Sequence, residues 1–160
     1  MALTTIVAAC DGSETDVPAA AGALEPNATV EGVVDGDTID VAIDGRSERV
    51  RLIGIDTPET KRPNSPVECF GPEASAHVAT LIAAGTAVRI ERDVVPRDVY
   101  GRLLGYVFRA EDGLFVNDEM VRRGFARPLT IEPNSAHARR FVESARTAEA
   151  DDLGLWANCS

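Results

Sequence analysis

The sequence predicts an α+β fold that is mainly β. Short runs rich in β-branched residues are separated by Gly- and Asp-containing turns, and three other segments repeat their apolar residues at helical spacing. One of these helical segments stands between the third and fourth β-rich runs. The length of 160 residues allows a single domain with a hydrophobic core, and the 44% hydrophobic share is ordinary for a globular domain.

Five β-rich runs are predicted strands. The first three form a meander, because turn sequences separate them, DGD at residues 35–37 and DG at residues 44–45. The last one turns at a second Asp-Gly pair, Asp112-Gly113. The strands are predicted at residues 29–34, 38–43, 49–55, 87–91 and 103–108.

Three segments are predicted helices, at residues 71–84, 116–123 and 135–150. Pro72 lies in the first turn of the first helix, where its missing N–H costs little. Asn134 is a suitable N-cap for the last helix. Five strands and three helices, with one helix between strands three and four, predict a five-stranded Greek-key barrel of the oligonucleotide/oligosaccharide-binding (OB) kind.

The first 28 residues differ in composition from the rest. Residues 1–10, MALTTIVAAC, are apolar and end in small residues and a cysteine. We expect a truncated or atypical lipoprotein-type signal segment with a lipid anchor at Cys10; an unprocessed terminus is the alternative, because the positively charged start is missing. Residues 11–28 are acidic and rich in Ala, Gly and Pro, which predicts a flexible linker. The domain is predicted at residues 29–160, and no run reaches transmembrane length.

The net charge of −10 argues by itself against a nucleic-acid partner. Its distribution weakens that argument. Residues 1–32 hold five acidic residues and no Lys or Arg, so the remaining chain carries 21 acidic against 16 basic residues. All basic residues except Lys61 are arginines, which suit bidentate phosphate contacts but are also explained by genome composition.

Two acidic clusters, VVDGDTIDV and RLIGIDTPET, follow the pattern of strand ends. The first cluster fits either of two interpretations: a hairpin turn that happens to be acidic, or two carboxylates placed to hold a ligand. If the second and third strands are antiparallel neighbours, Asp37 lies close to Asp56, and like charges converge only where a cation joins them. Oxygen ligands suit Ca²⁺, Mg²⁺ or Mn²⁺. Zinc is disfavoured, because His77 and His137 lie on predicted helices far along the chain, where they are expected to pack or face solvent.

Two arginines accompany these acids. Strand alternation places Arg51 on the same face as Ile53 and Ile55, where a charged group needs a partner. Arg102 directly precedes another apolar strand. Two arginines, two metal-binding carboxylates and a further carboxylate, Glu59, form a set suited to phosphoryl chemistry, in which cations stabilise developing charge and a carboxylate activates water.

With these motifs in order, the chain resembles the staphylococcal nuclease (thermonuclease) family over about residues 30–156. The resemblance rests on VDGDTIDV, RLIGIDTPET, the helix start FGPEAS, the segment RDVYGR and GLW near the end. It implies a Ca²⁺-dependent phosphodiesterase that hydrolyses DNA and RNA and leaves 3′-phosphate ends. The DGD segment is then both a turn and half of a metal site.

Site roles follow from the resemblance position by position. It implies that the Ca²⁺ ligands are Asp37, Asp56 and the backbone carbonyl of Thr57. Glu59 would act as general base or water-orienting group. Asp35 would lie behind the ligands. Arg51 and Arg102 would contact the phosphate and the transition state, and Tyr100 would form a hydrogen bond to a substrate phosphate.

The chain departs from the family pattern at two places. Val99 stands where the type member has a lysine, and the stretch RPLTIEPN (residues 127–134) lacks the tyrosines that line its nucleotide pocket. Nucleotide affinity and base preference therefore do not carry over.

The resemblance also bears on the three cysteines. Relatives with the same pair suggest a Cys69–Cys159 disulfide, which leaves Cys10 for lipidation and implies an extracytoplasmic protein, secreted or anchored at the cell envelope. Two buried free thiols and one thiol in the tail are the alternative. We expect a monomer.

Two rival functions remain open. The first is a catalytically silent OB-fold module that binds nucleic acid or protein, although such modules usually lose site residues. The second is a polysaccharide-binding barrel, which suits the acidic surface but leaves Arg51 and Arg102 unexplained.

Overall fold

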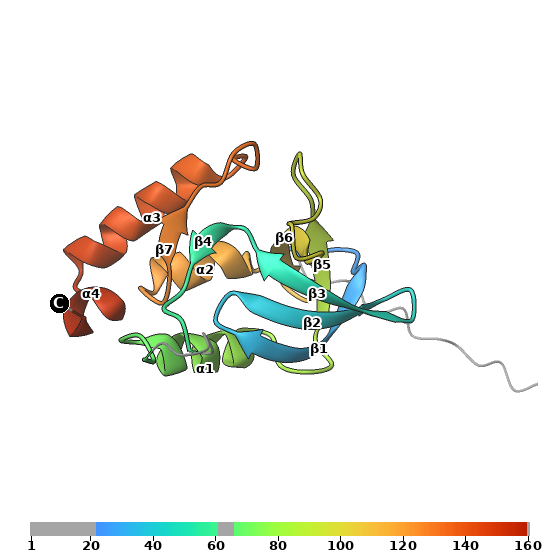
Figure 1. Ribbon diagram of the computed structural model, residues 1–160, viewed down its shortest axis with the longest axis horizontal. Helices are drawn as coiled ribbons and strands as arrows, with labels where there is room; N and C mark the ends of the chain where they lie inside the picture. The colour runs from blue at the N-terminus through green and yellow to red at the C-terminus, as the bar shows by residue number, and fades with distance from the viewer. Residues whose placement is uncertain (1–21, 61–65, 160) are drawn as a thin grey trace, which may run out of the picture.

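Five strands close into a barrel in the order β1-β2-β3-β6-β5, in a computed structural model that describes residues 22–60 and 66–159 (Figure 1). All neighbouring pairs are antiparallel except β3 and β6, which run parallel and close the barrel. This confirms the predicted mainly β, OB-type α+β fold. The barrel strands are β1 (Ala28–Asp35), β2 (Thr38–Ile43), β3 (Arg46–Leu52), β5 (Ala87–Glu91) and β6 (Leu103–Arg109).

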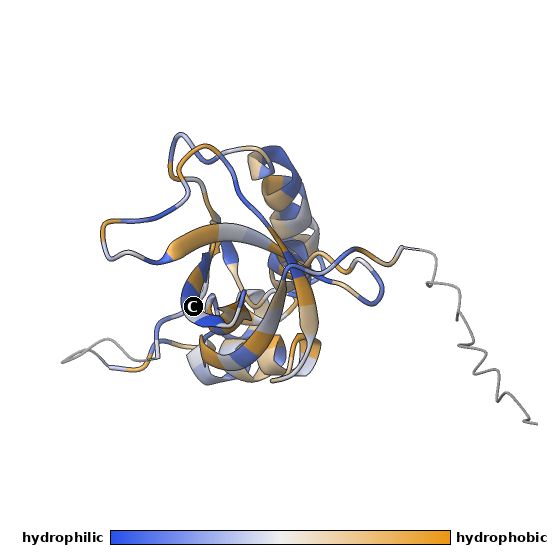
Figure 2. Cartoon of the chain, turned by 90° about the vertical axis from the view of Figure 1, so that its right-hand side faces the viewer, coloured by the Kyte–Doolittle hydropathy of each residue, from blue (hydrophilic) through white to orange (hydrophobic). Residues whose placement is uncertain are grey.

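The barrel interior is filled by aliphatic side chains at alternate strand positions. Ile39 and Val41 of β2 and Val50 and Leu52 of β3 are fully buried, whereas the intervening Asp40 and Arg51 are more exposed. Hydrophobic and hydrophilic segments accordingly alternate along the strands (Figure 2). Because burial fixes this register, it also fixes which side chains reach the outer face.

The described residues contain four helices, one more than the sequence predicts. The first, α1, packs against β1 and α2, while α3 packs against α2 and the short strand β7 (Figure 1). The extra helix has only four residues, too few to show a helical period. The helices are α1 (Gly71–Leu81), α2 (Val116–Arg122), α3 (Ala138–Ala150) and α4 (Leu155–Asn158).

The predicted strand at residues 49–55 is two strands. The barrel strand β3 ends at Leu52, and β4 (Gly54–Asp56) leaves the barrel to pair antiparallel with β7 (Arg127–Leu129). Gly54 has a φ of 81°, and a Cβ there would lie 2.2 Å from the Phe141 ring. Only glycine fits this break, which directs the acidic end of β4 to the edge of the barrel.

The last long helix begins later than predicted, at Ala138, and Asn134 is not its cap. The residue that precedes the helix is His137, which makes no side-chain capping bond. The Asn134 amide instead accepts a bond from the Val95 N–H (2.8 Å) and donates one to the Val95 carbonyl (2.9 Å). A tertiary contact has replaced the local one, and it ties the segment before α3 to the β5–β6 connection.

The folded part begins before residue 29. The Leu24 N–H donates to the Ala110 carbonyl (2.8 Å), and the Asn27 side chain exchanges two hydrogen bonds with the Ile90 backbone. The predicted signal segment at residues 1–10, including Cys10, and the linker up to residue 21 lie outside the described residues. Within residues 22–60 and 66–159, no helix has both the length and the apolar character needed to cross a membrane.

A disulfide links Cys69, just before α1, to Cys159, just after α4, across 90 residues of sequence. It joins the C-terminal segment to the helix beneath the barrel. The pairing that the family resemblance suggests is therefore present, and the alternative of two free thiols is wrong.

Candidate active site

The seven predicted site residues all line one cavity of about 570 Å³ at the edge of the barrel. Its walls come from the β1–β2 turn, the end of β3, the segment after β4 and the turn before β6. Strand pairing brings these four segments together from more than 60 residues of sequence. The predicted residues are Asp37, Arg51, Asp56, Thr57, Glu59, Tyr100 and Arg102.

The two predicted ligand carboxylates converge, although not through the predicted pairing: Asp37 directly precedes β2, whereas Asp56 ends β4, which pairs with β7. Arg51 Nη2 lies 3.0 Å from Asp37 Oδ2 and 3.1 Å from Asp56 Oδ1. Asp37 also accepts a bond from the Thr57 N–H (3.2 Å), which fixes the backbone of Thr57 beside it. Here the cationic group between the two carboxylates is a guanidinium, so the site joins like charges through a positive side chain of its own.

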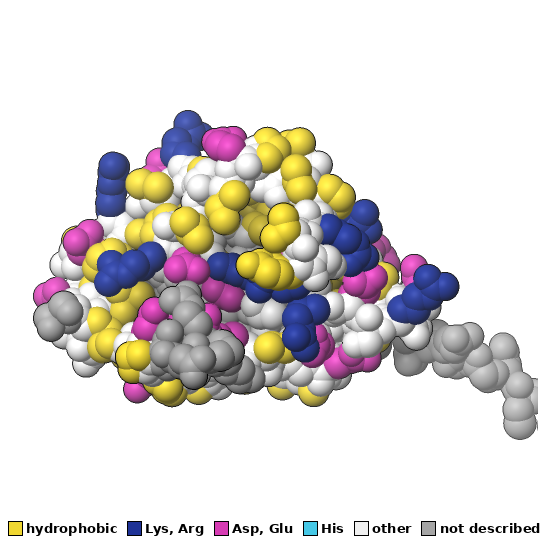
Figure 3. Space-filling model, viewed as in Figure 1, with side chains coloured by type: hydrophobic (Ala, Val, Ile, Leu, Met, Phe, Trp, Pro, Cys, Tyr) yellow, Lys and Arg dark blue, Asp and Glu magenta, His cyan; other side chains and the backbone are white. Residues whose placement is uncertain are grey.

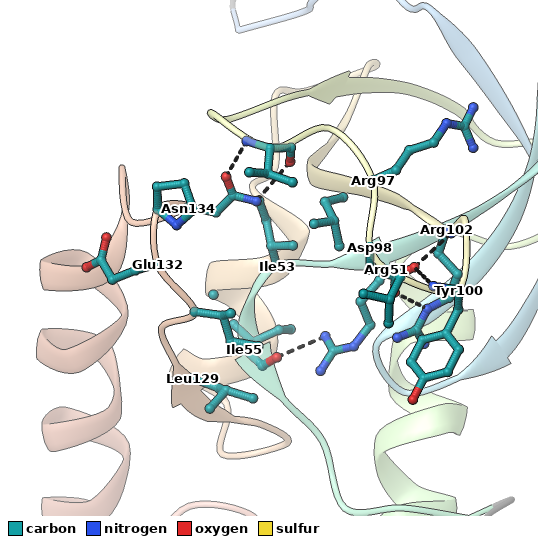
Figure 4. A pocket seen from close by; sticks show the side chains of 16 residues that line it. Arg51, Ile53, Ile55, Arg97, Asp98, Tyr100, Arg102, Leu129, Glu132 and Asn134 are labelled. Carbon is teal, nitrogen blue, oxygen red and sulfur yellow. Dashed lines mark hydrogen bonds and ion pairs between the residues drawn. The ribbon is translucent and has the colours of Figure 1, made fainter.

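The break between β3 and β4 builds the socket for Arg51. Its Nη1 donates to the backbone carbonyls of Leu52 and Ile55, the latter at 2.9 Å, so the arginine occupies the space where the strand has turned away (Figure 4). The side chain is only 14% exposed. This meets the expectation that a charged residue on this face needs partners, and it holds the guanidinium in one orientation.

Asp35 lines the cavity next to Asp37 and organises its acidic wall. Its carboxylate accepts bonds from the Gly36 N–H (2.8 Å) and from the Thr60 and Ser75 hydroxyls (2.9 Å each). Burial raises the pKa of Asp35, but its side-chain interaction with Glu59 and the bonds from Gly36, Thr60 and Ser75 outweigh burial, so the pKa lies below its usual range. The ionised carboxylate thereby ties the segment that carries Glu59 to α1.

Arg102 and Tyr100 stand on the opposite wall, in a turn that Asp98 holds together. Asp98 accepts bonds from Arg102 Nε (2.6 Å) and from the backbone N–H groups of Tyr100 and Arg102. Burial raises the pKa of Asp98, and the bonds from Arg102 outweigh it and lower the pKa. Tyr100 is 81% exposed at the cavity rim, with its ring 5.5 Å from Arg102 Cζ. Sequence reasoning missed Asp98, although its place before a Tyr-Gly turn is typical of a turn-forming aspartate.

The donor atoms beside Arg51 fit a hard cation. Two carboxylates and the Thr57 carbonyl are oxygen ligands, which Ca²⁺ and Mg²⁺ prefer, and water would complete the coordination. Among residues 22–60 and 66–159, no group of three or more His, Cys, Asp or Glu side chains is arranged around one point. His77 and His137 are packing residues, stacked on Phe125 (4.0 Å) and set against Tyr106 (4.5 Å).

A second cavity of about 420 Å³ adjoins the first and shares Arg51, Tyr100 and Arg102 with it. In Figure 4 these side chains lie on one side, with Leu129, Glu132 and Asn134 opposite. Sequence analysis noted the altered residues 127–134 but did not predict this cavity. Aliphatic side chains dominate its lining: Ile53, Ile55, Val95, Leu104, Leu129 and Ile131.

A closed five-stranded barrel with five carboxylates and three arginines lining one cavity defines an OB-fold protein with a charged site at the barrel edge. The family model described as "Staphylococcal nuclease homologue" matches residues 49–158, which include every predicted site residue except Asp37. The chain belongs to this family.

Three relatives show the extent of the likeness. The chain is 39% identical over 127 residues to "Thermonuclease" of Staphylococcus intermedius, covering 79% of this chain and 74% of that protein. It is 36% identical to "Thermonuclease" of Staphylococcus hyicus, with 79% and 73% covered. It is 38% identical to "Endonuclease YncB" of Bacillus subtilis, where the match covers 82% of this chain and 62% of the relative.

Proposed function

We propose that this chain is a Ca²⁺-dependent endonuclease that hydrolyses DNA and RNA and leaves 3′-phosphate ends. Membership of the family, together with relatives named thermonuclease and endonuclease, makes the chain a nuclease, a hydrolase of phosphodiester bonds. The observation that carries the finer proposal is that the predicted carboxylates Asp37, Asp56 and Glu59 line one cavity together with the predicted arginines Arg51 and Arg102.

The acidic wall would hold the metal. Asp37, Asp56 and the Thr57 carbonyl supply oxygen ligands, and the buried Asp37–Thr57 contact supports a preformed pair. Bound there, Ca²⁺ would offset the charge of the substrate phosphate and lower the pKa of a coordinated water. Arg51 already contacts both carboxylates, so a phosphate brought to the ion also meets the guanidinium.

Proton transfer is assigned to Glu59. Its carboxylate would take a proton from water as the oxygen attacks phosphorus in line, and the bond from phosphorus to the 5′-oxygen would break, with the 5′-oxygen taking up a proton from solvent to leave as a hydroxyl. The phosphate then stays on the 3′ side. Arg51 and Arg102 would donate to the phosphoryl oxygens as charge builds, and the Tyr100 hydroxyl would reach a substrate phosphate from the rim.

The aliphatic cavity supports a broad substrate range. It shares Arg51 and Arg102 with the acidic cavity, so a nucleoside next to the reacting phosphate has an apolar surface to contact. Polar side chains in its lining are already bonded within the protein, Asn134 to Val95 and Arg97 to Glu48, so they are not free to read a base edge or a 2′-hydroxyl, which favours cleavage of both DNA and RNA.

We place the protein outside the cytoplasm, secreted or lipid-anchored through Cys10, and acting as a monomer. The Cys69–Cys159 disulfide supports this location, since disulfides persist in oxidising compartments.

A plasmid-degradation assay tests the proposal against a silent OB-fold binding module. The protein should degrade plasmid DNA and a structureless RNA with Ca²⁺ and stop when a chelator is added. A binding module would retard the plasmid on a gel without cutting it. Ca²⁺ affinity should lie at about 10⁻⁴–10⁻³ M, because few protein ligands are present.

A further inference from the structure

A groove continues from the acidic cavity along the outside of the barrel. It has a volume of about 470 Å³ and lies between the β2–β3 hairpin and the turn before β6. Three of its lining residues, Arg49, Tyr100 and Arg102, also line the acidic cavity. A strand bound at the acidic site therefore has a hollow to enter on this side.

Strand geometry places a second arginine in line with Arg51. Arg49 and Arg51 occupy alternate positions of β3, opposite Asp40 and Thr38 of β2, so both side chains emerge on the outer face. Alternate residues of a strand are roughly 7 Å apart. That spacing is comparable to the separation of successive phosphates along an extended nucleic-acid strand.

Arg49 is held with one end of its guanidinium available. Its Nε and Nη2 donate to the two oxygens of Asp40 at 2.8 and 3.0 Å, which fixes the plane of the group. The side chain is 52% exposed, and its Nη1 has no hydrogen-bond partner among the described residues. An oriented arginine with a spare donor is suited to a charge-assisted bond with a phosphate oxygen.

The charge around the groove fits an anionic strand. Arginine side chains gather over the β2–β3 hairpin in Figure 3, interleaved with acidic ones. A further hollow of about 410 Å³ is lined by Arg46, Arg92 and Arg97 together with Asp44 and Glu48. For a chain with a net charge of −10, this is a local concentration of arginine beside the site.

We propose that Arg49 binds a phosphate of the substrate strand next to the one that is cleaved, which makes this groove a subsite for longer strands. The inference rests on the proposed nuclease function. It predicts a preference for oligonucleotides over a dinucleotide, whose single phosphodiester occupies the acidic cavity alone.

The first experiment compares the cleavage of a tetranucleotide and of a dinucleotide. For Arg49→Gln, the ratio of the two kcat/KM values should fall about tenfold, the size of one charge-assisted contact. The matched control is Arg122→Gln, which removes the same charge from a side chain that is 51% exposed, paired with Glu119 and outside these cavities. The control should keep the ratio within about twofold.

The second experiment measures the salt dependence of binding, using a fluorescent single-stranded oligonucleotide and a chelator to prevent cleavage. Loss of one phosphate contact should reduce the slope of log K against log salt by about 0.7 for Arg49→Gln. The slope for Arg122→Gln should match the wild type. Melting temperatures confirm that both variants fold.

Two results overturn the inference: an unchanged ratio, as when both substrates lose activity equally, or the same fall of the ratio in the control. Absence of cleavage by the wild type overturns the proposed function instead. The salt slope then decides by itself whether Arg49 contacts a phosphate, and an unchanged slope rejects the subsite.

Discussion

The acidic cavity and the aliphatic cavity share Arg51, Tyr100 and Arg102, yet they are built in different ways. In the acidic cavity, the turn after β1 and the end of β4 bring charged residues together, and ion pairs hold them in place. One wall of the aliphatic cavity comes from residues 129–134, which the pairing of β7 with β4 and the Asn134–Val95 bonds bring to the site. The acidic cavity therefore depends on contacts between charged side chains, whereas the aliphatic cavity depends on packing between segments that are distant in sequence.

This difference predicts how each cavity responds to change. Charged groups held by several bonds act on the transition state, where loss of one group changes the rate by orders of magnitude. Aliphatic contacts stabilise the bound substrate and the transition state to a similar extent, so their loss changes mainly the affinity for substrate. Variants on the two sides should therefore separate kcat from KM.

Glu59→Gln should show the largest effect. The amide keeps the shape of the side chain but cannot accept the proton, so kcat should fall by about 10²–10⁴-fold. Rates are measured on plasmid and oligonucleotide substrates, with thermal melting as a check of folding. Near-normal cleavage would remove Glu59 from the mechanism even though the fold is unchanged.

Arg102→Lys tests the geometry of the other charged wall. Lysine keeps the charge but loses the planar fork that contacts Asp98 and would contact phosphate, so kcat should fall by about 10²–10³-fold. Arg122→Lys is the control, since Arg122 forms an ion pair outside the cavity. If both variants cleave alike, Arg102 is a surface residue and not a phosphate contact.

Much of the acidic cavity could be predicted from the sequence because its residues lie in short, contiguous motifs. VDGDT and IDTPET each combine a strand end, a turn and a carboxylate, so local rules place Asp37 and Asp56 correctly. The sequence does not predict the role of Asp98. Its carboxylate binds the Arg102 side chain and the backbone N–H groups of Tyr100 and Arg102, and these contacts exist only once residues 98–102 form a turn.

The aliphatic wall could not be predicted, because distant contacts override local preference there. Gly54 breaks an apolar run that otherwise reads as one strand, and its reason is the Phe141 ring of a helix almost 90 residues away. Asn134 has the chemistry of a helix cap but bonds Val95 instead. Neither partner is visible within a sequence window.

Reduction of the Cys69–Cys159 disulfide tests the difference between the two cavities through the stability of the protein. Closing a long loop contributes roughly 2–4 kcal/mol, so reduction should lower the melting temperature. The Cys159 segment follows Trp156, which stacks on Arg127 of β7 at 4.3 Å, so the loss of support should reach the aliphatic wall first. We expect KM to rise more than kcat falls after reduction. Alkylation of Cys69 and Cys159 in unreduced native protein would contradict the linkage.

Leu129→Ser should show the smallest effect and tests the aliphatic wall directly. Leu129 is 39% exposed and faces the cavity from β7, so a hydroxymethyl group removes apolar contact with a bound nucleoside. KM should rise about three- to tenfold, with the larger part of the change in kcat/KM coming from KM.

Val142→Ser provides the matched control for this prediction. Val142 is 38% exposed on α3 and does not line the cavity, so the same kind of polar replacement should leave KM within about twofold. If Leu129→Ser lowers kcat as strongly as Arg102→Lys, the two cavities act as one catalytic unit and the separation between them fails. If KM does not change, the nucleoside does not contact this wall. A rise in KM confined to Leu129→Ser would show that β7 determines how tightly the substrate binds, whereas the acidic motifs determine how fast it is cleaved. The break at Gly54 would then be what brings β7 to the site.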